Sequence, residues 1–311
     1  MTRRSVGIEI SPAQRFSLWR TIYSHGWCSL PPFSVDTKKR VLKLTLARGP
    51  RHPVQLEIRQ GSPNSLQATF ESVAPVSHAE GQSIILTAAS CLRLDEDYTE
   101  FYAQARRHPQ FRWVPRTGAG RLLRAPTVFE DVVKMICTTN CSWGLTEVMV
   151  GNLCSKLGTP ASNGAGEQGA GSTFPTPEAI ADTTEKYLRK EIRTGYRAPY
   201  LLELARRVAS RDLDLESLRA SDAGTVDLFD QLRSVKGVGP YAAANILKLL
   251  GRYDYLGIDS WCRKQFFILH KNGRKSSDRV IEKFYGPFGK WRGLFFWLDV
   301  TRHWLDKKIP F

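Results

Sequence analysis

The stretch LRSVKGVGPYAAANIL, residues 232–247, carries two closely spaced glycines between two helical patterns. Glycine adopts positive φ readily and lets another backbone come close, so Gly237 and Gly239 predict a tight turn that opens a helix near Tyr241. The unpaired amides and the positive dipole end of such a helix suit a phosphate group, and Lys236 and Lys248 are expected to add positive charge there. Because this turn would contact only the backbone of a nucleic acid, it would bind without reading base sequence. A tight helix–helix turn without any ligand is the plainer alternative.

The charge of the chain favours a polyanionic partner. Its 311 residues include 45 Lys and Arg against 30 Asp and Glu, so the net charge is +15, and the pI is near 9.7. Such a surplus favours nucleic acid first and an anionic membrane surface second. No apolar run predicts a signal peptide or a membrane span. A merely soluble basic protein fits the charge equally well. We expect a protein of the cytoplasm or nucleoid, or of the nucleus in a eukaryote, that is a monomer and has no membrane partner.

The six cysteines form neither a CxxC pair nor a regular framework, which predicts free thiols in a reducing compartment. Cys137 and Cys141 are spaced for one helix face, but no histidine or second cysteine pair completes a zinc site. The spacing of an iron–sulfur cluster is absent too. No redox cofactor or catalytic metal is expected.

The chain divides into two patterns. Alternation and apolar runs predict four strands: 40–47, 54–60, 65–73 and 81–90. We expect an α+β protein, with an N-terminal antiparallel sheet domain over residues 1–105 that includes a helix around 12–24. An all-helical domain then covers residues 106–311, with a flexible Gly-, Ala- and Ser-rich loop at about 158–173.

One helical pattern is unusually long and apolar. It covers residues 127–158 and predicts a buried helix. Thr127 is expected to cap this helix, with Glu130 as the partner in a capping box. Further helical patterns follow, and one of them ends near Ser234, just before the glycine turn.

Asp259 lies twenty residues after Gly239, where an apolar segment meets the next helix. The hairpin LRSVKGVG, a helix and then Ile258-Asp259 resemble the signature of the helix-hairpin-helix DNA glycosylases. Three further stretches resemble the 8-oxoguanine members: FEDVVKMICTTNCSWGLT, FPTPEAIA with the later GYRAPYL, and YGPFGKWRGLFFWLDV. An N-terminal sheet is also shared with the bacterial alkyladenine glycosylases. The resemblance covers nearly the whole chain, loosely before residue 120.

This resemblance implies catalysis by Asp259. Glycosylases flip a nucleotide out of the duplex and break its base–sugar bond. A carboxylate beside the sugar stabilises the oxocarbenium-like transition state and orients or deprotonates the attacking water. The ordinary alternative for this aspartate is an N-cap of the helix that follows it, and the two roles are compatible.

The resemblance also implies contacts with DNA. The gap left by the flipped base would be filled by a wedge, Tyr196, and by two residues that bind the orphaned partner base, Asn140 and Arg197. The phosphate backbone 3′ of the lesion would be held by Lys236, Gly237, Val238, Gly239 and Tyr241. A structural Na⁺ or K⁺ would bind the backbone carbonyls of Arg233, Val235 and Val238.

Tyr241 is the main departure from the 8-oxoguanine pattern. The bifunctional enzymes carry a lysine there, which attacks the sugar and forms a Schiff base, and a phenol cannot do this. A tyrosine at this place resembles the monofunctional thymine and uracil mismatch glycosylases. Lys236 stands where the family usually has proline, so it is either a relocated amine or a phosphate contact.

The pocket positions differ as well. Gly293 and Trp297 stand where the 8-oxoguanine enzymes use Gln and Phe, and Trp261 replaces a histidine. Tyr241, Trp261 and Trp297 predict an aromatic base pocket that favours a flat and especially a cationic base, although both tryptophans also suit core packing.

We therefore expect a monofunctional DNA glycosylase of base-excision repair with alkylated-purine or broad damaged-base specificity. One alternative is an 8-oxoguanine or uracil/thymine-mismatch glycosylase, with or without lyase activity. Another is a non-catalytic, structure-selective DNA-binding protein.

Overall fold

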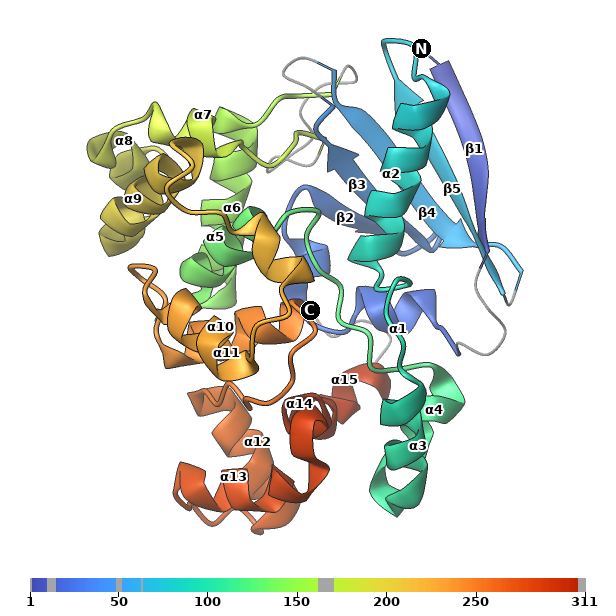
Figure 1. Ribbon diagram of the computed structural model, residues 1–311, viewed down its shortest axis with the longest axis vertical. Coiled ribbons are helices and arrows are strands. Elements are labelled where there is room, and N and C mark those ends of the chain that lie inside the picture. The colour runs from blue at the N-terminus through green and yellow to red at the C-terminus, as the bar shows by residue number, and fades with distance from the viewer. Residues whose placement is uncertain (1, 10–14, 49–51, 63, 162–170, 307–311) are drawn as a thin grey trace.

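The computed structural model describes residues 2–9, 15–48, 52–62, 64–161 and 171–306. The chain begins with a five-stranded antiparallel sheet (Figure 1). Its strands, in spatial order, are β1 (Thr2–Glu9), β5 (Ser65–Ser72), β4 (Val54–Gln60), β3 (Val41–Leu46) and β2 (Phe33–Asp36). Buried and partly exposed residues alternate along β4 and β5, and Leu56 is paired with Phe70 on the buried face. The α+β class and the antiparallel sheet are confirmed.

The predicted strand over 81–90 is wrong, because these residues lie in helix α2 (His78–Cys91), which runs across one face of the sheet (Figure 1). Ser77 caps this helix: its hydroxyl accepts the N–H of Glu80 at 3.2 Å, and the Glu80 carboxylate accepts the N–H of Ser77 at 2.8 Å. The buried residues recur at helical spacing: Gly81, Ile84, Ala88 and Cys91. An apolar run suits a strand and a helix equally, and here the capping box decides for the helix.

The first helix of the sheet region is short. It is α1 (Leu18–Ile22), which lies within the predicted span of 12–24. Residues 12–14 of that span lie outside the described residues. Strand β1 was not predicted, because it carries only two large apolar side chains, Val6 and Ile8. It belongs to the sheet through its antiparallel pairing with β5.

The rest of the described chain is helical. Its α-helices are α3 (Thr99–Arg107), α4 (Trp113–Thr117), α5 (Val128–Thr138), α6 (Trp143–Leu157), α7 (Pro177–Ala181), α8 (Glu185–Lys190), α9 (Ala198–Ala209), α10 (Thr225–Arg233), α11 (Pro240–Leu249), α12 (Ser260–His270), α13 (Asp278–Tyr285), α14 (Arg292–Val300) and α15 (Arg302–Asp306). Short 3₁₀ turns lie between them and in the sheet region: η1 (Gly26–Ser29), η2 (Pro109–Phe111), η4 (Gly195–Arg197), η5 (Glu216–Ala220) and η6 (Gly286–Trp291). None of the described helices is both long and apolar enough to cross a membrane.

The long helix predicted over 127–158 is two helices, α5 and α6. Asn140 lies between them with a φ of 49°, a left-handed conformation that a helix cannot continue through. Thr127 caps α5 as predicted, accepting the N–H of Glu130 at 3.2 Å. The carboxylate of Glu130 does not close a capping box; it pairs instead with the Nζ of Lys134 at 2.6 Å. Both charges are buried, so each depends on the other.

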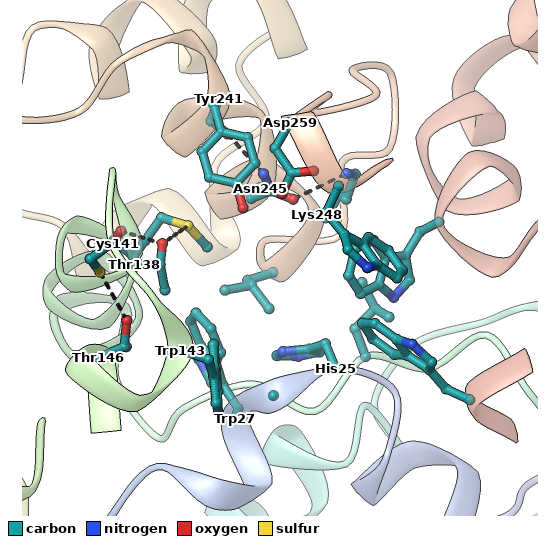
Figure 2. Close-up of a pocket in the computed structure, with 17 residues that line it drawn as sticks. His25, Trp27, Thr138, Cys141, Trp143, Thr146, Tyr241, Asn245, Lys248 and Asp259 are labelled. Atoms are coloured by element: carbon teal, nitrogen blue, oxygen red, sulfur yellow. Dashed lines mark hydrogen bonds between the residues drawn. The ribbon is translucent and has the colours of Figure 1, made fainter. Parts of the chain in front are cut away.

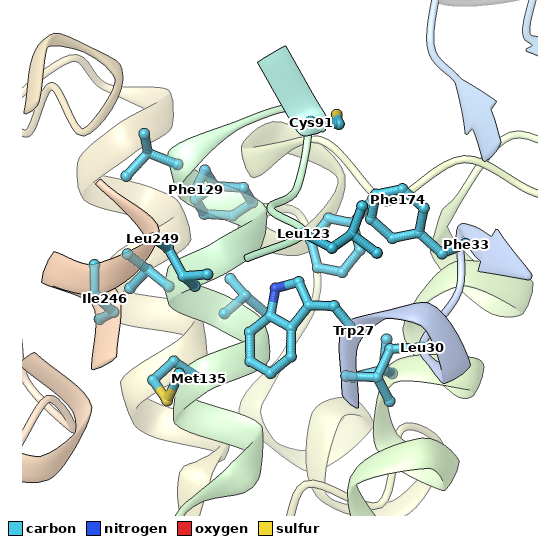
Figure 3. Close-up of a cluster of buried hydrophobic side chains, with 14 of the residues drawn as sticks. Trp27, Leu30, Phe33, Cys91, Leu123, Phe129, Met135, Phe174, Ile246 and Leu249 are labelled. Atoms are coloured by element: carbon cyan, nitrogen blue, oxygen red, sulfur yellow. The ribbon is translucent and has the colours of Figure 1, made fainter. Parts of the chain in front are cut away.

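Two buried clusters hold the molecule together. The first joins the sheet to α5 and α11, and its centre contains Trp27, Phe129 and Leu249 (Figure 3). The second joins α3 and α4 to the C-terminal helices; the rings of Phe101 and Phe295 are 4.9 Å apart there. The division of the chain at residue 105 stays a prediction. Of the loop predicted at 158–173, residues 162–170 lie outside the described part of the chain.

Candidate active site

The glycine turn joins α10 to α11, as the sequence predicts. Gly237 has a φ of 89°, and a Cβ on it would lie 2.8 Å from the ring of Tyr200. Gly239 is the N-cap residue of α11 with a φ of −81°, and nothing lies within 4 Å of its Cβ position. The first glycine is therefore required by the turn, whereas the second leaves the start of α11 open.

Substitution of Gly237 by alanine is expected to lower the free energy of unfolding by about 1–3 kcal/mol, because alanine must adopt positive φ against the Tyr200 ring. Gly239→Ala is the matched control in the same turn, and its cost should stay below about 1 kcal/mol. Urea unfolding of both variants measures the difference. Equal losses would contradict this account of the turn.

The remaining hairpin residues lie outside the cavity described below. Lys236 is exposed, and its Nζ binds the carboxylate of Glu203 at 3.0 Å. That hydrogen bond raises the pKa of Lys236. The carbonyl of Val235 accepts the N–H of Val238 at 3.0 Å, so one of the three carbonyls named for a cation has a backbone partner. A cation at Arg233, Val235 and Val238 stays a prediction.

Asp259 caps α12, and its carboxylate also lies in the wall of a cavity. Its Oδ1 accepts the N–H of Cys262 at 2.6 Å. The phenol of Tyr241 is its neighbour: burial, then the negative charge of Asp259 and a hydrogen bond to it, raise the pKa of Tyr241. Tyr241 is thus a neutral phenol near the carboxylate. The N-cap role of Asp259 is confirmed, and the cap holds its side chain at the cavity wall. Its catalytic role stays a prediction.

The cavity has a volume of about 420 Å³, which leaves room for a flat heterocycle. Figure 2 shows α11 and Asp259 on one side of it, with His25, Trp27 and Trp143 across from them. Six aromatic side chains besides His25 line it: Trp27, Trp143, Tyr241, Trp261, Trp297 and Trp304. All three aromatic residues proposed from the sequence are among these six. The other three were not proposed as pocket residues, although Trp143 lies in the quoted stretch FEDVVKMICTTNCSWGLT.

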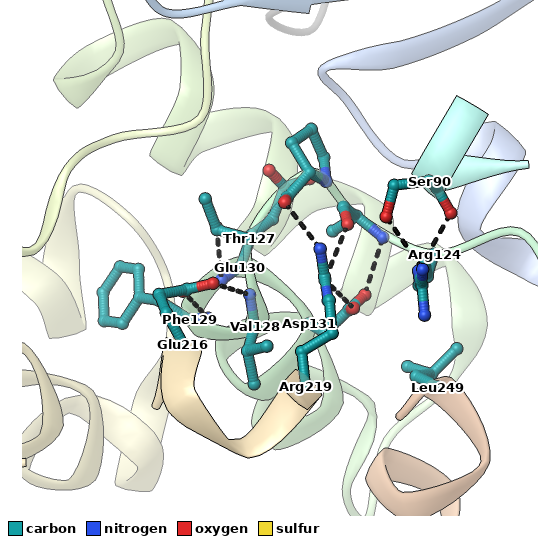
Figure 4. A network of polar contacts seen from close by, with 12 residues as sticks. Ser90, Arg124, Thr127, Val128, Phe129, Glu130, Asp131, Glu216, Arg219 and Leu249 are labelled. Atoms are coloured by element: carbon teal, nitrogen blue, oxygen red, sulfur yellow. Dashed lines mark hydrogen bonds and ion pairs between the residues drawn. The ribbon is translucent and has the colours of Figure 1, made fainter. Parts of the chain in front are cut away.

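The indoles are held by their own N–H groups. The Nε1 of Trp27 donates to Asp131 at 2.7 Å, and that of Trp297 donates to the Ser24 carbonyl at 2.8 Å. Asp131 also accepts the N–H of Ala125 at 3.0 Å, within a polar network at the start of α5 (Figure 4). These contacts fix the aromatic walls before any ligand arrives.

Packing explains why α14 carries Gly293 at a position where the 8-oxoguanine enzymes carry a glutamine. The N–H of Gly293 donates to the Tyr253 carbonyl at 2.7 Å. A Cβ on it would lie 2.2 Å from the Tyr255 carbonyl oxygen. The side chain expected at this pocket position is therefore excluded by the loop that leads to Asp259.

His25 lines the cavity as a neutral ring. It is 9% exposed, and its Nε2 lies 2.5 Å from the Leu123 carbonyl, so Nε2 carries the proton. Burial lowers the pKa of His25 to about 3, helped by nearby cations and opposed by the bond to Leu123.

This burial predicts a pH-dependent stability. The unfolded chain binds a proton at His25 near pH 6.5 and the native state only near pH 3, so stability falls as pH drops through that window. Between pH 6.5 and 5 the loss attributable to this residue is about 2 kcal/mol. His25→Gln should remove that part of the slope in urea unfolding at the two pH values. An unchanged slope would show that His25 titrates normally.

The predicted wedge residues lie together at the α5–α6 break. Tyr196 is 44% exposed, and its phenol oxygen lies 3.3 Å from the Asn140 Nδ2. Arg197 is only 3% exposed: it donates to the Thr139 carbonyl and lies 4.5 Å from the Tyr196 ring centre. Asn140 and Tyr196 are thus exposed side by side, and the buried Arg197 packs against them. Their contact with DNA stays a prediction, as does the contact of Arg197 with a partner base.

Asn245 and Lys248 also line the cavity and were not proposed as cavity residues. The expectation that Lys248 adds charge beside the phosphate is wrong, because its side chain is buried in the cavity wall. Asn245 and Lys248 follow Tyr241 on α11 at four and seven residues, so the three share one face of the helix. The Nδ2 of Asn245 donates to the Tyr241 carbonyl at 2.9 Å. A lysine inside the apolar run AAANILKLL was the available signal.

The chain is similar in sequence and fold to known proteins. A model of the HhH-GPD superfamily, base excision DNA repair proteins, matches residues 133–283. The N-glycosylase/DNA lyase of Saccharomyces cerevisiae is 28% identical over 147 residues, which is 42% of this chain and 38% of the yeast protein's length.

Two solved structures share the fold over almost the full chain. The 3-methyladenine DNA glycosylase of Archaeoglobus fulgidus has a TM-score of 0.74 at 20% identity, covering 96% of this chain and 99% of its own. The 8-oxoguanine glycosylase/lyase of Clostridium acetobutylicum has a TM-score of 0.71 at 21% identity, with 95% of each chain covered. Residues 133–283 of the chain thus match the HhH-GPD superfamily of base excision DNA repair proteins, and the two solved structures show that the fold is shared.

Proposed function

We propose that this protein is a DNA glycosylase that turns a damaged base out of the duplex and hydrolyses its N-glycosidic bond. The observation that carries this proposal is the place of Asp259, whose carboxylate lies in the wall of an aromatic cavity sized for one base. The open start of α11 lies one helix before Asp259 in the chain, in the hairpin that joins α10 to α11. A phosphate held there would fix the backbone of the flipped nucleotide, with a monovalent cation as a further proposed element.

The chemistry follows from the charge that develops on the sugar. As the C1′–N bond breaks, positive charge spreads over C1′ and the ring oxygen, and a fixed carboxylate stabilises it without reorganising. Water then adds to C1′, and Asp259 accepts or directs its proton. The Cys262 N–H holds the carboxylate in place, and the neutral phenol of Tyr241 lies near it. The product is an abasic site.

We propose that the enzyme hydrolyses the bond without cutting the strand. Tyr241 supplies no amine, and Lys236 is ion-paired to Glu203 and is not among the residues that line the cavity. One observation favours the lyase alternative: Lys248 is an amine that does line it. Its Nζ is bound by Asn245 at 3.2 Å and by the Leu256 carbonyl.

For the substrate we propose damaged bases in a broad range, alkylated purines included. Aromatic side chains on several sides of the cavity favour stacking with a flat heterocycle whatever its substituents. The exposed Tyr196 would fill the stack after the base has left. The enzyme is proposed to act as a monomer on double-stranded DNA.

An excision panel tests this function. Duplexes carrying uracil, hypoxanthine, 8-oxoguanine or 1,N6-ethenoadenine opposite each partner base are incubated with the protein, together with methylated DNA. Half of each sample is treated with alkali to cut abasic sites. Base release with strand breaks only after alkali is the expected result. Breaks without alkali, with a protein–DNA adduct trapped by borohydride, would establish a lyase. A protein that binds these duplexes but releases no base would be a binding protein.

A further inference from the structure

Lys248 places a buried amine in the wall of the cavity. It lies on α11 two turns after Tyr241, on the same face, and only 2% of it is exposed (Figure 2). Its Nζ donates to the Oδ1 of Asn245 at 3.2 Å and to the Leu256 carbonyl. Both acceptors are neutral. Among the described residues, no carboxylate forms an ion pair with Lys248, so its positive charge is uncompensated by direct contact.

An ammonium group has three donors, and these two acceptors use two of them. Burial lowers the pKa of Lys248 to about 8, while Cys262 and Asp259 act in the opposite direction. At neutral pH the amine is therefore mostly charged. A charged donor in a cavity walled by indoles is poorly solvated, and it gains most from a ligand that becomes negative beside it.

We propose that Lys248 is a catalytic residue that stabilises the departing base. This inference rests on the proposed glycosylase function. The base leaves with the electron pair of the C1′–N bond, so a neutral base departs as an anion. The Lys248 ammonium donates a hydrogen bond to that anion and then its proton. Water adds to C1′ and gives its proton to Asp259. Asp259 then releases this proton to solvent, and Lys248 takes up a proton from solvent. The sum is the addition of one water across the C1′–N bond.

The positive charge of Lys248 determines which lesions are released faster. A neutral base such as hypoxanthine or 8-oxoguanine needs this help, since its anion is a poor leaving group. A cationic base such as 7-methylguanine leaves as a neutral molecule and gains nothing from a donor. In the cavity it is also repelled by the ammonium group before the bond breaks. Lys248 therefore directs the enzyme towards neutral lesions within the proposed range.

The test compares Lys248→Met with the wild type in single-turnover release from two kinds of DNA. One kind carries hypoxanthine or 8-oxoguanine, and the other carries 7-methylguanine and 3-methyladenine. Met keeps the length of the side chain and removes the charge. We expect the rate on neutral lesions to fall about 100-fold and the rate on cationic lesions to change less than about threefold. Lys156→Met, which removes an exposed ion pair with Glu191, should leave both rates unchanged.

A pH profile of the wild type keeps the proposal testable if Lys248→Met folds poorly. The charged and titratable groups around Lys248 are Arg93, His25, Tyr241, Asp259 and Cys262. Burial raises the pKa of the Cys262 thiol and of the Tyr241 phenol and lowers that of His25, so these three do not change charge between pH 7 and 9. Release of neutral lesions should fall as pH rises through about 8, and release of cationic lesions should not.

The outcomes separate the two proposals. Release that depends on Asp259 but falls equally on both kinds of DNA in Lys248→Met would make Lys248 a structural tie to Leu256 and would overturn this inference alone. This inference alone would also be overturned if the wild type released only cationic bases. A borohydride adduct that Lys248→Met abolishes would overturn it too, because Lys248 would then be a nucleophile. Release of neutral bases only, with the expected loss, supports the inference. Release of no lesion would overturn the proposed function, and this inference with it.

Discussion

Asp259→Asn is expected to lower the rate of base release by at least about 100-fold while binding to an abasic-site duplex persists. Asparagine is nearly isosteric and is itself a good N-cap, so the start of α12 should remain intact with its bond to the Cys262 N–H. What the substitution removes is the negative charge that faces the developing oxocarbenium ion. Single-turnover release from the best substrate of the excision panel measures the rate, and band shifts measure binding.

A matched control separates this effect from a general loss of charge. Asp212→Asn removes an exposed carboxylate that accepts only a local bond from Ser210 at 2.6 Å, and it should release bases at the wild-type rate. If Asp259→Asn kept its activity, the carboxylate would be an N-cap and nothing more. If both release and binding were lost, with a lowered unfolding temperature, the variant would have failed to fold, and Asp259→Ser, another good N-cap, would replace it.

The parts of the fold that the sequence predicted are those with local signals. The strands over 54–60 and 65–73 show clear alternation, and the glycine turn with its two helices has a backbone reason in Gly237. The predicted strand over 81–90 failed because an apolar run has no period, and the deciding capping box lies just before it at Ser77. The single helix over 127–158 failed at Asn140, whose positive φ no pattern of apolar residues announces.

The candidate site shows the same limit. Asp259, Trp261 and Tyr241 could be proposed because they stand at fixed distances from the glycine turn. Trp27 could not, since it reaches the cavity from a 3₁₀ turn more than 200 residues earlier and is aimed there by the bond to Asp131. Lys248 reads in sequence as one more basic residue. Only its burial and its neutral partners reveal an amine in the cavity.

Arg93 is the residue on which the position of α11 most depends. Its guanidinium is fully buried, with the side chain 0% exposed. It donates to the carbonyls of Lys248 and Leu249 at 2.5 and 2.6 Å, at the end of α11, where the Lys248 carbonyl also accepts the N–H of Gly251 at 3.2 Å. A third bond reaches the Leu122 carbonyl at 2.8 Å, and Glu96 balances the charge at 2.7 Å. One side chain thus ties the segment after α2 to the helix that carries the cavity's polar residues.

Arg93→Met should therefore lower the free energy of unfolding by about 3–5 kcal/mol, because it removes a buried donor from the Leu122 and Leu249 carbonyls and one of the two arginine partners of Glu96. Arg189→Met is the matched control: it removes an exposed ion pair with Glu185 at 2.6 Å and should cost about 0.5 kcal/mol or less. Urea unfolding of the two variants measures both values. Because the freed end of α11 carries Lys248, base release by folded Arg93→Met should also fall. A loss below about 1 kcal/mol would mean that the α11 carbonyls find water or other donors, and that α11 is held by its apolar face alone.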